Sequence, residues 1–153
     1  MRLAIIAIAW GFLTAGAVAG DNALQVGLGH QVLKVDRCFT KVAGGKAILT
    51  VSPLRRIKDM FEGEFDMKVA PYFFKNDKGK LAIIVSDEAM AKVSAGSTVD
   101  ITGTATTKAG KSSVVRHINA EATPLDAQHG MLKVWLTVDE RELVFQTKYW
   151  FVE

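Results

Sequence analysis

The sequence has a single cysteine and lacks the patterns that mark common metal sites. Cys38 has no partner in the 153-residue chain, which excludes an internal disulfide. None of the three histidines, His30, His117 and His129, has a His or Cys partner at a metal-ligand spacing. The sequence therefore predicts no metal site. Cys38 is interpreted as a small buried apolar residue, with a reactive or intermolecular thiol as the alternative.

Nucleotide-binding and hydrolase motifs are also missing. The Gly-rich run at 42–47 lacks the Lys-Ser/Thr ending of a phosphate-binding loop, and the run at 27–32 lacks the third glycine of a dinucleotide fingerprint. No Gly-x-Ser-x-Gly elbow occurs. We therefore expect no cofactor and no catalytic residues. An enzyme whose site is assembled from residues distant in the sequence is the alternative.

Charge is scarce at the N-terminus, where Arg2 is the only charged residue before Asp21. Residues 3–13 form an apolar run, and Ala17 and Ala19 supply the small residues that signal peptidase accepts. The sequence predicts a signal peptide at 1–19, cleaved after Ala19, and export to the periplasm or the outside of a bacterial-type cell. No stable membrane span would remain after cleavage. An uncleaved membrane anchor is the alternative reading of this run.

Removal of 19 of the 153 residues leaves 134, enough for one domain with one core. The chain carries a net charge of +3, which falls to +2 when Arg2 is removed. A charge so close to neutral gives little support for a nucleic-acid partner. We expect an N-terminal lead-in at 20–45 that contains a possible strand, followed by a single β-barrel-like domain at 46–153.

Alternation of apolar and polar residues is the main pattern of this domain, and it predicts strands rather than helices. Strands are expected at 46–52, 64–75, 80–86, 98–106, 112–122, 131–138 and 143–152. Phe65 and Phe73 are assigned to the core face of the second strand. One short helix is expected at 87–95, with Ser86 or Asp87 as its N-cap, Met90 and Val93 packed on the sheet, and Gly96 at its end.

The order β-β-β-α-β-β across residues 46–122 resembles the OB-fold, a small five-stranded Greek-key barrel with its helix between the third and fourth strands. The run "SAGSTVDITGTATT" carries this resemblance, with Gly103 as a glycine in the middle of a strand. The predicted fold is mainly β: a small, twisted, antiparallel, OB-like barrel. A C-terminal β-hairpin at 131–152 lies outside the OB pattern and extends the barrel or covers an open end.

The resemblance also implies a ligand face, because OB domains commonly bind ligands with two of their loops and the face between them. Here those loops are residues 53–63 and 108–111, and their basic residues are expected to be near neighbours in one groove. Two aromatic residues would add to the face. The predicted ligand-binding residues are Arg55, Arg56, Lys58, Tyr72, Phe74, Lys108 and Lys111. Cationic loops around aromatic rings suit an anionic polymer or an oligosaccharide.

The C-terminal hairpin holds much of the aromatic content, and both of its faces carry apolar residues. Such a hairpin is either central to the sheet or in contact with another chain, as in a homo-oligomer. We therefore expect an exported, non-enzymatic binding or accessory domain of unknown ligand. The alternative is a structural or assembly protein of the cell envelope that self-associates through this hairpin.

Overall fold

The computed structural model describes residues 32–109 and 111–153, so the predicted signal peptide lies outside the described residues. The described chain is mainly β, with one α-helix, as predicted. Its elements are β1 (Val32–Val35), β2 (Cys38–Val42), β3 (Gly45–Val51), β4 (Leu54–Ile57), β5 (Met60–Ala70), the 3-10 turn η3 (Phe73–Lys75), β6 (Asp77–Ile84), α1 (Asp87–Ser94), β7 (Val99–Ala109), β8 (Ser112–Pro124), β9 (His129–Val138) and β10 (Arg141–Val152).

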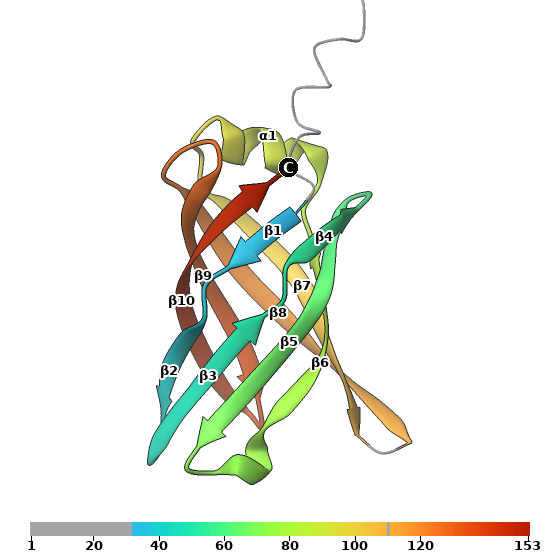
Figure 1. Ribbon diagram of the computed structural model, residues 1–153, viewed down its shortest axis with the longest axis vertical. Coiled ribbons are helices and arrows are strands. Elements are labelled where there is room, and N and C mark those ends of the chain that lie inside the picture. The colour runs from blue at the N-terminus through green and yellow to red at the C-terminus, as the bar shows by residue number, and fades with distance from the viewer. Residues whose placement is uncertain (1–31, 110) are drawn as a thin grey trace, which may run out of the picture.

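The strands form a closed, twisted antiparallel barrel (Figure 1). From β5 to β10, each strand pairs with the strand that follows it in the sequence. The barrel closes where β1 pairs with both β10 and β4, and β4 pairs with β5. The predicted small antiparallel barrel is therefore confirmed. The C-terminal hairpin of β9 and β10 extends it, because β9 also pairs with β8.

Two long strands of the barrel are each broken in the middle. β3 and β4 pair with different parts of β5 and are separated by Ser52 and Pro53. β1 and β2 are separated by Asp36 and Arg37. The prediction that 53–63 is a loop is wrong, because this segment forms β4 and the beginning of β5. The four-residue strand β4 is too short for its alternation of apolar and polar residues to be distinguished from a loop.

The order β-β-β-α-β-β is present, from β3 through β8 with β4 inserted, but the pairing is a meander. β6 and β7, which flank α1, pair directly over Gly79–Ile84 and Thr102–Thr107. A Greek key would place a more distant strand beside them. The strand pairing therefore differs from the one that the OB-fold resemblance implies, and the loops take different places around the barrel.

The core lies inside the barrel and is formed by inward-facing residues at alternate strand positions. In β7 and β8 the buried series are Val99, Ile101, Ala105 and Ile118, Ala120, Ala122. Of the aromatic residues in the C-terminal hairpin, Phe145, Tyr149 and Phe151 are buried in this core. Cys38 is also buried, as predicted. The inward-facing aromatic residues of the hairpin are thus part of the core of the barrel.

The helix closes one end of the barrel, at the top of Figure 1. Ser86 is its N-cap, since its hydroxyl accepts a hydrogen bond from the Ala89 N–H at 3.2 Å. Gly96 follows the helix with a φ of +86°, the left-handed conformation predicted there. Met90 and Val93 are buried, as predicted. The short helix is stabilised by this packing, because two turns are too short to stand alone.

The opposite end carries the turn between β2 and β3, the loop with η3, the β7–β8 hairpin tip and the β9–β10 turn (Figure 1). The chain leaves the sheet after Ala70, with a cis Ala70–Pro71 peptide, and returns at Asp77. The prediction that Phe73 is a core residue is wrong, because Phe73 lies on η3 and is 69% exposed. The strand was predicted to continue through Phe73, but β5 ends at Ala70 and the chain turns at Pro71.

Candidate ligand-binding site at the open end of the barrel

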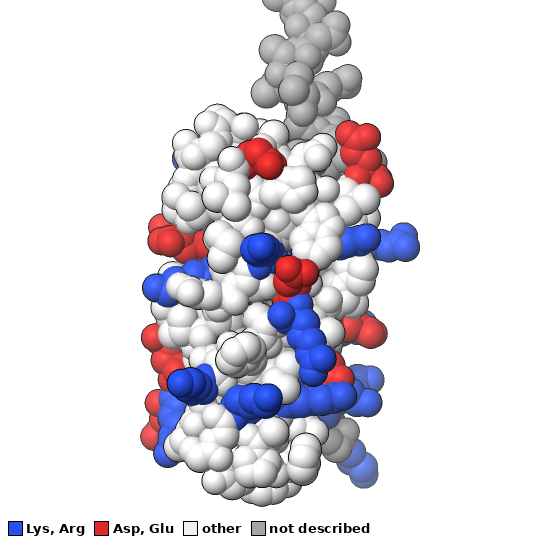
Figure 2. All heavy atoms as spheres, turned by 60° about the vertical axis from the view of Figure 1, so that its left-hand side comes forward, with Lys and Arg blue, Asp and Glu red and all other residues white. Residues whose placement is uncertain are grey.

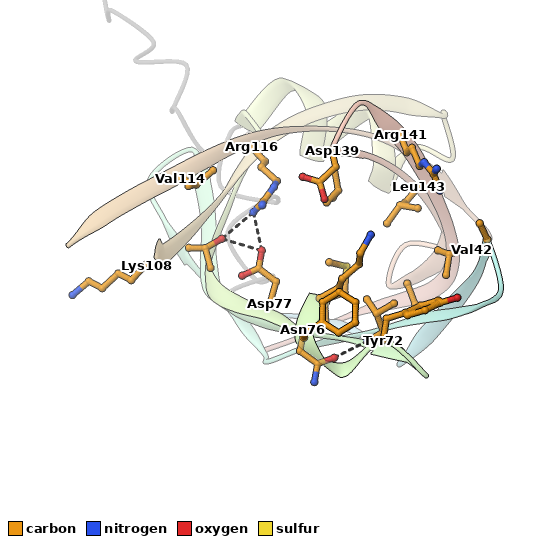
Figure 3. Close-up of a pocket in the computed structure, with 18 residues that line it drawn as sticks. Val42, Tyr72, Asn76, Asp77, Lys108, Val114, Arg116, Asp139, Arg141 and Leu143 are labelled. Atoms are coloured by element: carbon orange, nitrogen blue, oxygen red, sulfur yellow. Dashed lines mark hydrogen bonds and ion pairs between the residues drawn. The ribbon is translucent and has the colours of Figure 1, made fainter. Parts of the chain in front are cut away.

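A cavity of about 880 Å³ opens at the end of the barrel opposite α1 (Figure 3). Its floor consists of the buried side chains of Ala47, Met67 and Val69. Val42 on β2 and Leu143 on β10 contribute apolar side chains to the wall of the cavity. The middle of the barrel below this floor is almost filled, with an apolar void of only about 60 Å³. The open-end cavity is therefore a shallow chamber with an apolar base.

One side of the cavity is bounded by two strands that do not pair with each other. Within the described residues, no ladder joins β2 to β10, although Val42 and Arg141 line the same cavity. The chain is hydrogen-bonded to β10 just before β2 begins, at Asp36. There the Asp36 N–H donates to the Lys148 carbonyl at 3.0 Å, and the Thr147 hydroxyl donates to the Asp36 carbonyl at 2.8 Å. The cavity therefore reaches the edge of the barrel between β2 and β10.

A polar network on the opposite wall joins three neighbouring strands, β6, β7 and β8. Arg116 Nη1 donates to Asp77 Oδ2 at 2.7 Å and to Thr107 Oγ1 at 3.1 Å. The Thr107 hydroxyl donates to Asp77 Oδ2 at 3.2 Å. The Arg116 and Asp77 side chains are 23% and 16% exposed, so their ion pair is partly shielded from water. This network holds the guanidinium at the cavity wall.

Arg116 uses only Nη1 for these contacts. Its Nε and Nη2 groups make no hydrogen bond with the described residues. A guanidinium presents its donors in a rigid fork that suits carboxylate and phosphate groups. Arg116 is therefore oriented by Asp77 and Thr107 and still has donors available for an anionic group in the cavity.

Charged side chains surround the mouth of the cavity. Four lining residues are basic and two are acidic: Lys75, Lys108, Arg116, Arg141, Asp77 and Asp139. Figure 3 shows Asp139 pointing into the opening and Lys108 pointing away from its centre. The balance of the lining charges is +2, which favours an anionic group over a cationic one at the mouth.

The structure brings together three of the predicted site residues. Tyr72, Phe74 and Lys108 all line the cavity. The rings of Tyr72 and Phe74 are in edge-to-face contact, with centroids 6.0 Å apart. Lys111 lies near the tip of the β7–β8 hairpin, beyond Lys108. Phe74 lies on η3 with Tyr72 as its N-cap, instead of on the predicted strand, and Lys108 lies on β7 instead of in the predicted loop.

The other three predicted residues, Arg55, Arg56 and Lys58, lie near the closed end. Ile57 pairs with Met60, Met60 with Ile84, and Ile84 with Thr102. Lys108 lies six residues further along β7, a distance of about 20 Å at the usual rise of a strand. The prediction that the two basic segments share one groove is therefore wrong, because the meander places them toward opposite ends.

Arg56 stabilises the closed end. Its Nη2 group forms an ion pair with Asp87 Oδ1 at 2.7 Å, and its Nε donates to the Lys58 carbonyl at 3.0 Å. The guanidinium also lies 5.4 Å from the centroid of the Phe61 ring. The Arg56 side chain is only 9% exposed. These contacts tie the β4–β5 turn to the first turn of α1, where Asp87 is also favoured by the helix dipole.

Sequence reasoning missed Asp77, Arg116, Asp139 and Arg141. A signal for Arg116 was present, because it occupies an inward position in the series that continues with Ile118 and Ala120. A charged residue at a core-facing position needs a partner. The partner, Asp77, is 39 residues away in the sequence, and only the pairing of β6 with β7 and β7 with β8 brings it close.

Two buried ionisable groups elsewhere in the barrel are kept neutral by burial. Burial raises the pKa of the Cys38 thiol, an effect partly offset by its interaction with the Thr147 side chain. Burial, with a smaller contribution from Asp126, raises the pKa of Tyr149 to about 12. Neither group is ionised near neutral pH, so neither offers a thiolate or phenolate nucleophile there.

Among residues 32–109 and 111–153, no three His, Cys, Asp or Glu residues cluster so as to hold a metal ion.

Comparison with known proteins finds no family model that matches the chain, no matching curated protein and no matching solved structure. Within the part of the chain that the structure describes, no helix has the length and apolar character needed to cross a membrane.

Proposed function

We propose that this protein is an exported, non-enzymatic binding protein that holds a small anionic amphiphile in the open-end cavity. The observation that carries the proposal is Arg116, whose guanidinium is oriented by Asp77 and Thr107 at the wall of a chamber with an apolar floor. The anionic group of the ligand would meet Nε and Nη2 of Arg116. Its apolar part would rest on Met67 and Val69.

The size of the cavity supports a small molecule. Ligand sites commonly measure about 300–1,000 Å³ and are mostly apolar with a few placed polar groups. The volume of about 880 Å³ lies within that range. The closed barrel has eight strands, with extra strands beside it, and by fold analogy eight-stranded barrels can hold one small ligand in the interior. An extended polymer or oligosaccharide receives less support, because that expectation depended on a groove shared by the two basic segments.

Self-association through the outer surface of the barrel is the alternative function. Trp135 and Trp150 are the half-buried aromatic residues on the outer face of the C-terminal hairpin, and the Lys133 ammonium lies 4.8 Å from the centroid of the Trp135 ring. A concentration series in sedimentation velocity measures this directly. A monomer at all concentrations would favour the binding protein over the assembly protein.

A matched ligand series tests the proposed chemistry. Octanoate, octanol and octylammonium share an apolar chain and differ in charge. We expect octanoate to bind most tightly, because the lining has an excess of basic residues and Arg116 has unused donors. Octylammonium should bind most weakly. Isothermal titration at low salt gives the three dissociation constants, and equal affinity for all three would rule out an anion-selective site.

Variants of the ion pair give the sharper test. Arg116→Gln should weaken octanoate binding by about 10- to 100-fold, because it removes a charge-assisted hydrogen bond. Asp77→Asn should strengthen octanoate binding by up to about tenfold, because it removes a carboxylate that competes for the same guanidinium. Asp77→Asn should also lower the free energy of unfolding by about 1–2 kcal/mol.

Two controls separate binding from folding. The double variant Asp77→Asn/Arg116→Gln removes both charges of this ion pair and should bind as weakly as Arg116→Gln alone. Arg55→Gln makes the same type of change at an exposed position near the closed end and should leave binding unaltered. If Arg116→Gln binds octanoate as tightly as the unmodified protein, Arg116 is not the anion contact.

Export is the second part of the proposal. The observations in its favour are the lone charge of Arg2, the apolar run at 3–13 and the small residues Ala17 and Ala19. Mass spectrometry of the protein isolated from its native host should show an N-terminus at Gly20, or within a residue or two of it. A mature chain that retains Met1 would contradict export with cleavage.

A further inference from the structure

Large aromatic side chains are exposed together at the open end of the barrel. Phe39, Phe73 and Phe74 are 65%, 69% and 82% exposed, and Tyr72 is 37% exposed. Phenylalanine is usually buried, and a cluster of exposed rings marks a surface that meets an apolar partner. The cluster forms because the chain turns out of the sheet at Pro71, which places η3 at the tip of the molecule instead of in the core.

The aromatic residues lie on two sides of the same tip. Tyr72 and Phe74 line the cavity mouth. Phe39 and Phe73 line a separate shallow hollow on the outer surface, together with Pro71, Lys41 and Lys46. The outer hollow shares no residue with the cavity. The tip therefore presents apolar rings both at the mouth and beside it.

Basic residues surround this tip. We define the open-end segments as 41–46, 66–78, 106–116 and 138–142. They contain nine Lys or Arg and five Asp or Glu residues, a net charge of +4. The rest of the described chain contains nine basic and ten acidic residues. Figure 2 shows one face of the molecule, on which blue side chains form a band across the lower part, above a white tip. The charge of the protein is thus concentrated near the exposed rings.

We propose that the open end docks on the surface of an anionic phospholipid bilayer. Phenylalanine and tyrosine side chains enter the boundary between headgroups and acyl chains, while lysines remain at the level of the phosphates. An anionic surface attracts each nearby Lys or Arg, and the open-end segments have four more basic than acidic residues. This combination of exposed rings with a surrounding basic band fits a membrane surface.

The docked orientation would face the cavity mouth toward the lipid, which is a source of anionic amphiphiles. Docking itself does not depend on the ligand, since Phe39, Phe73, Lys41 and Lys46 do not line the cavity. The two proposals can therefore fail separately. Loss of vesicle binding with intact octanoate binding would overturn the docking surface alone.

Vesicle co-sedimentation tests the proposal. We expect the protein to bind phosphatidylcholine vesicles that contain phosphatidylglycerol and to bind pure phosphatidylcholine vesicles at least tenfold more weakly. Binding should also fall as salt is raised, because screening weakens the attraction. Equal binding to both kinds of vesicle, or no binding to either at low salt, would overturn the proposal. All variants carry the same N-terminus, so differences in vesicle binding between them arise from the substitutions.

Two pairs of substitutions locate the surface. Phe39→Ser/Phe73→Ser and Lys41→Gln/Lys46→Gln should each lower binding to the anionic vesicles by about an order of magnitude. The matched controls are Ile57→Ser/Leu125→Ser, which removes exposed apolar residues toward the other end, and Lys92→Gln/Lys148→Gln, which removes exposed lysines outside the open-end segments. The controls should keep full binding. A control that loses as much as its open-end counterpart would contradict the assigned surface.

Discussion

Phe61→Ala is expected to lower the free energy of unfolding by about 3–5 kcal/mol. The Phe61 side chain is completely buried near the closed end of the barrel. Its ring lies 6.0 Å from the ring of Phe151, which comes from the last strand, and 5.4 Å from the Arg56 guanidinium. Truncation to alanine removes these contacts and leaves a cavity between β5, β10 and the β4 segment, which the surrounding barrel cannot readily fill.

Chemical denaturation of the unmodified protein and the variant measures this loss. Phe39→Ala is the matched control, because it deletes the same side-chain atoms at a position that is 65% exposed, and it should change the stability by less than about 0.5 kcal/mol. A loss below about 1 kcal/mol for Phe61→Ala would show that the closed end is not packed as described. The octanoate affinity of the folded variant should be retained, since Phe61 does not line the cavity.

The parts of the fold that could be predicted from the sequence depend on neighbouring residues. The helix is signalled by Ser86 at its start and Gly96 at its end, and both residues act through local backbone geometry. The long hairpin of β7 and β8 is signalled by alternation over many residues, so its inward and outward faces could be assigned correctly. Each of these signals is complete within one short segment.

The closure of the barrel could not be predicted, because it depends on pairs far apart in the sequence. β1 pairs with β10 through Val32 and Val152, and these residues are separated by almost the whole described chain. Alternation says which residues of a strand face inward but not which strand lies beside it. A meander and a Greek key can therefore have the same order of elements. The misplacement of Arg55, Arg56 and Lys58 follows from that ambiguity.

In the candidate site, too, some residues could be predicted from one segment and others depend on pairs far apart in the sequence. Tyr72 and Phe74 were predicted because the OB-fold resemblance placed them on a strand face between two basic loops, and both line the cavity although they do not lie on a strand. The Arg116–Asp77 pair was missed, since it requires the register of two ladders: Gly79 pairs with Thr107, and Thr107 pairs with Val114. Register depends on turn geometry and on the whole buried face. A site formed by adjacent strands is therefore harder to predict than a motif within one segment.

Gly103 is a position where a substitution should disturb the barrel wall directly. It lies at an inward position of β7 and pairs with Ile83 of β6. A Cβ atom on Gly103 would lie 2.5 Å from the carbonyl oxygen of Ala82 and 3.2 Å from the Cα of Ile83. Both neighbours are backbone atoms of the adjacent strand, so relief of the contact requires β6 and β7 to separate. This mid-strand glycine thus permits close approach of two backbones.

Gly103→Val should lower the free energy of unfolding by about 3 kcal/mol, despite the higher β-propensity of valine. Gly103→Ala should cause most of the same loss, because the clash begins at Cβ and not at the γ-methyl groups. Thr102→Val is the control on the same strand, since it places a β-branched residue of equal size on the exposed face. Thermal and urea unfolding of the three variants measure these differences. If Gly103→Ala is neutral or stabilising, β6 and β7 do not approach as closely at this point as the clash requires.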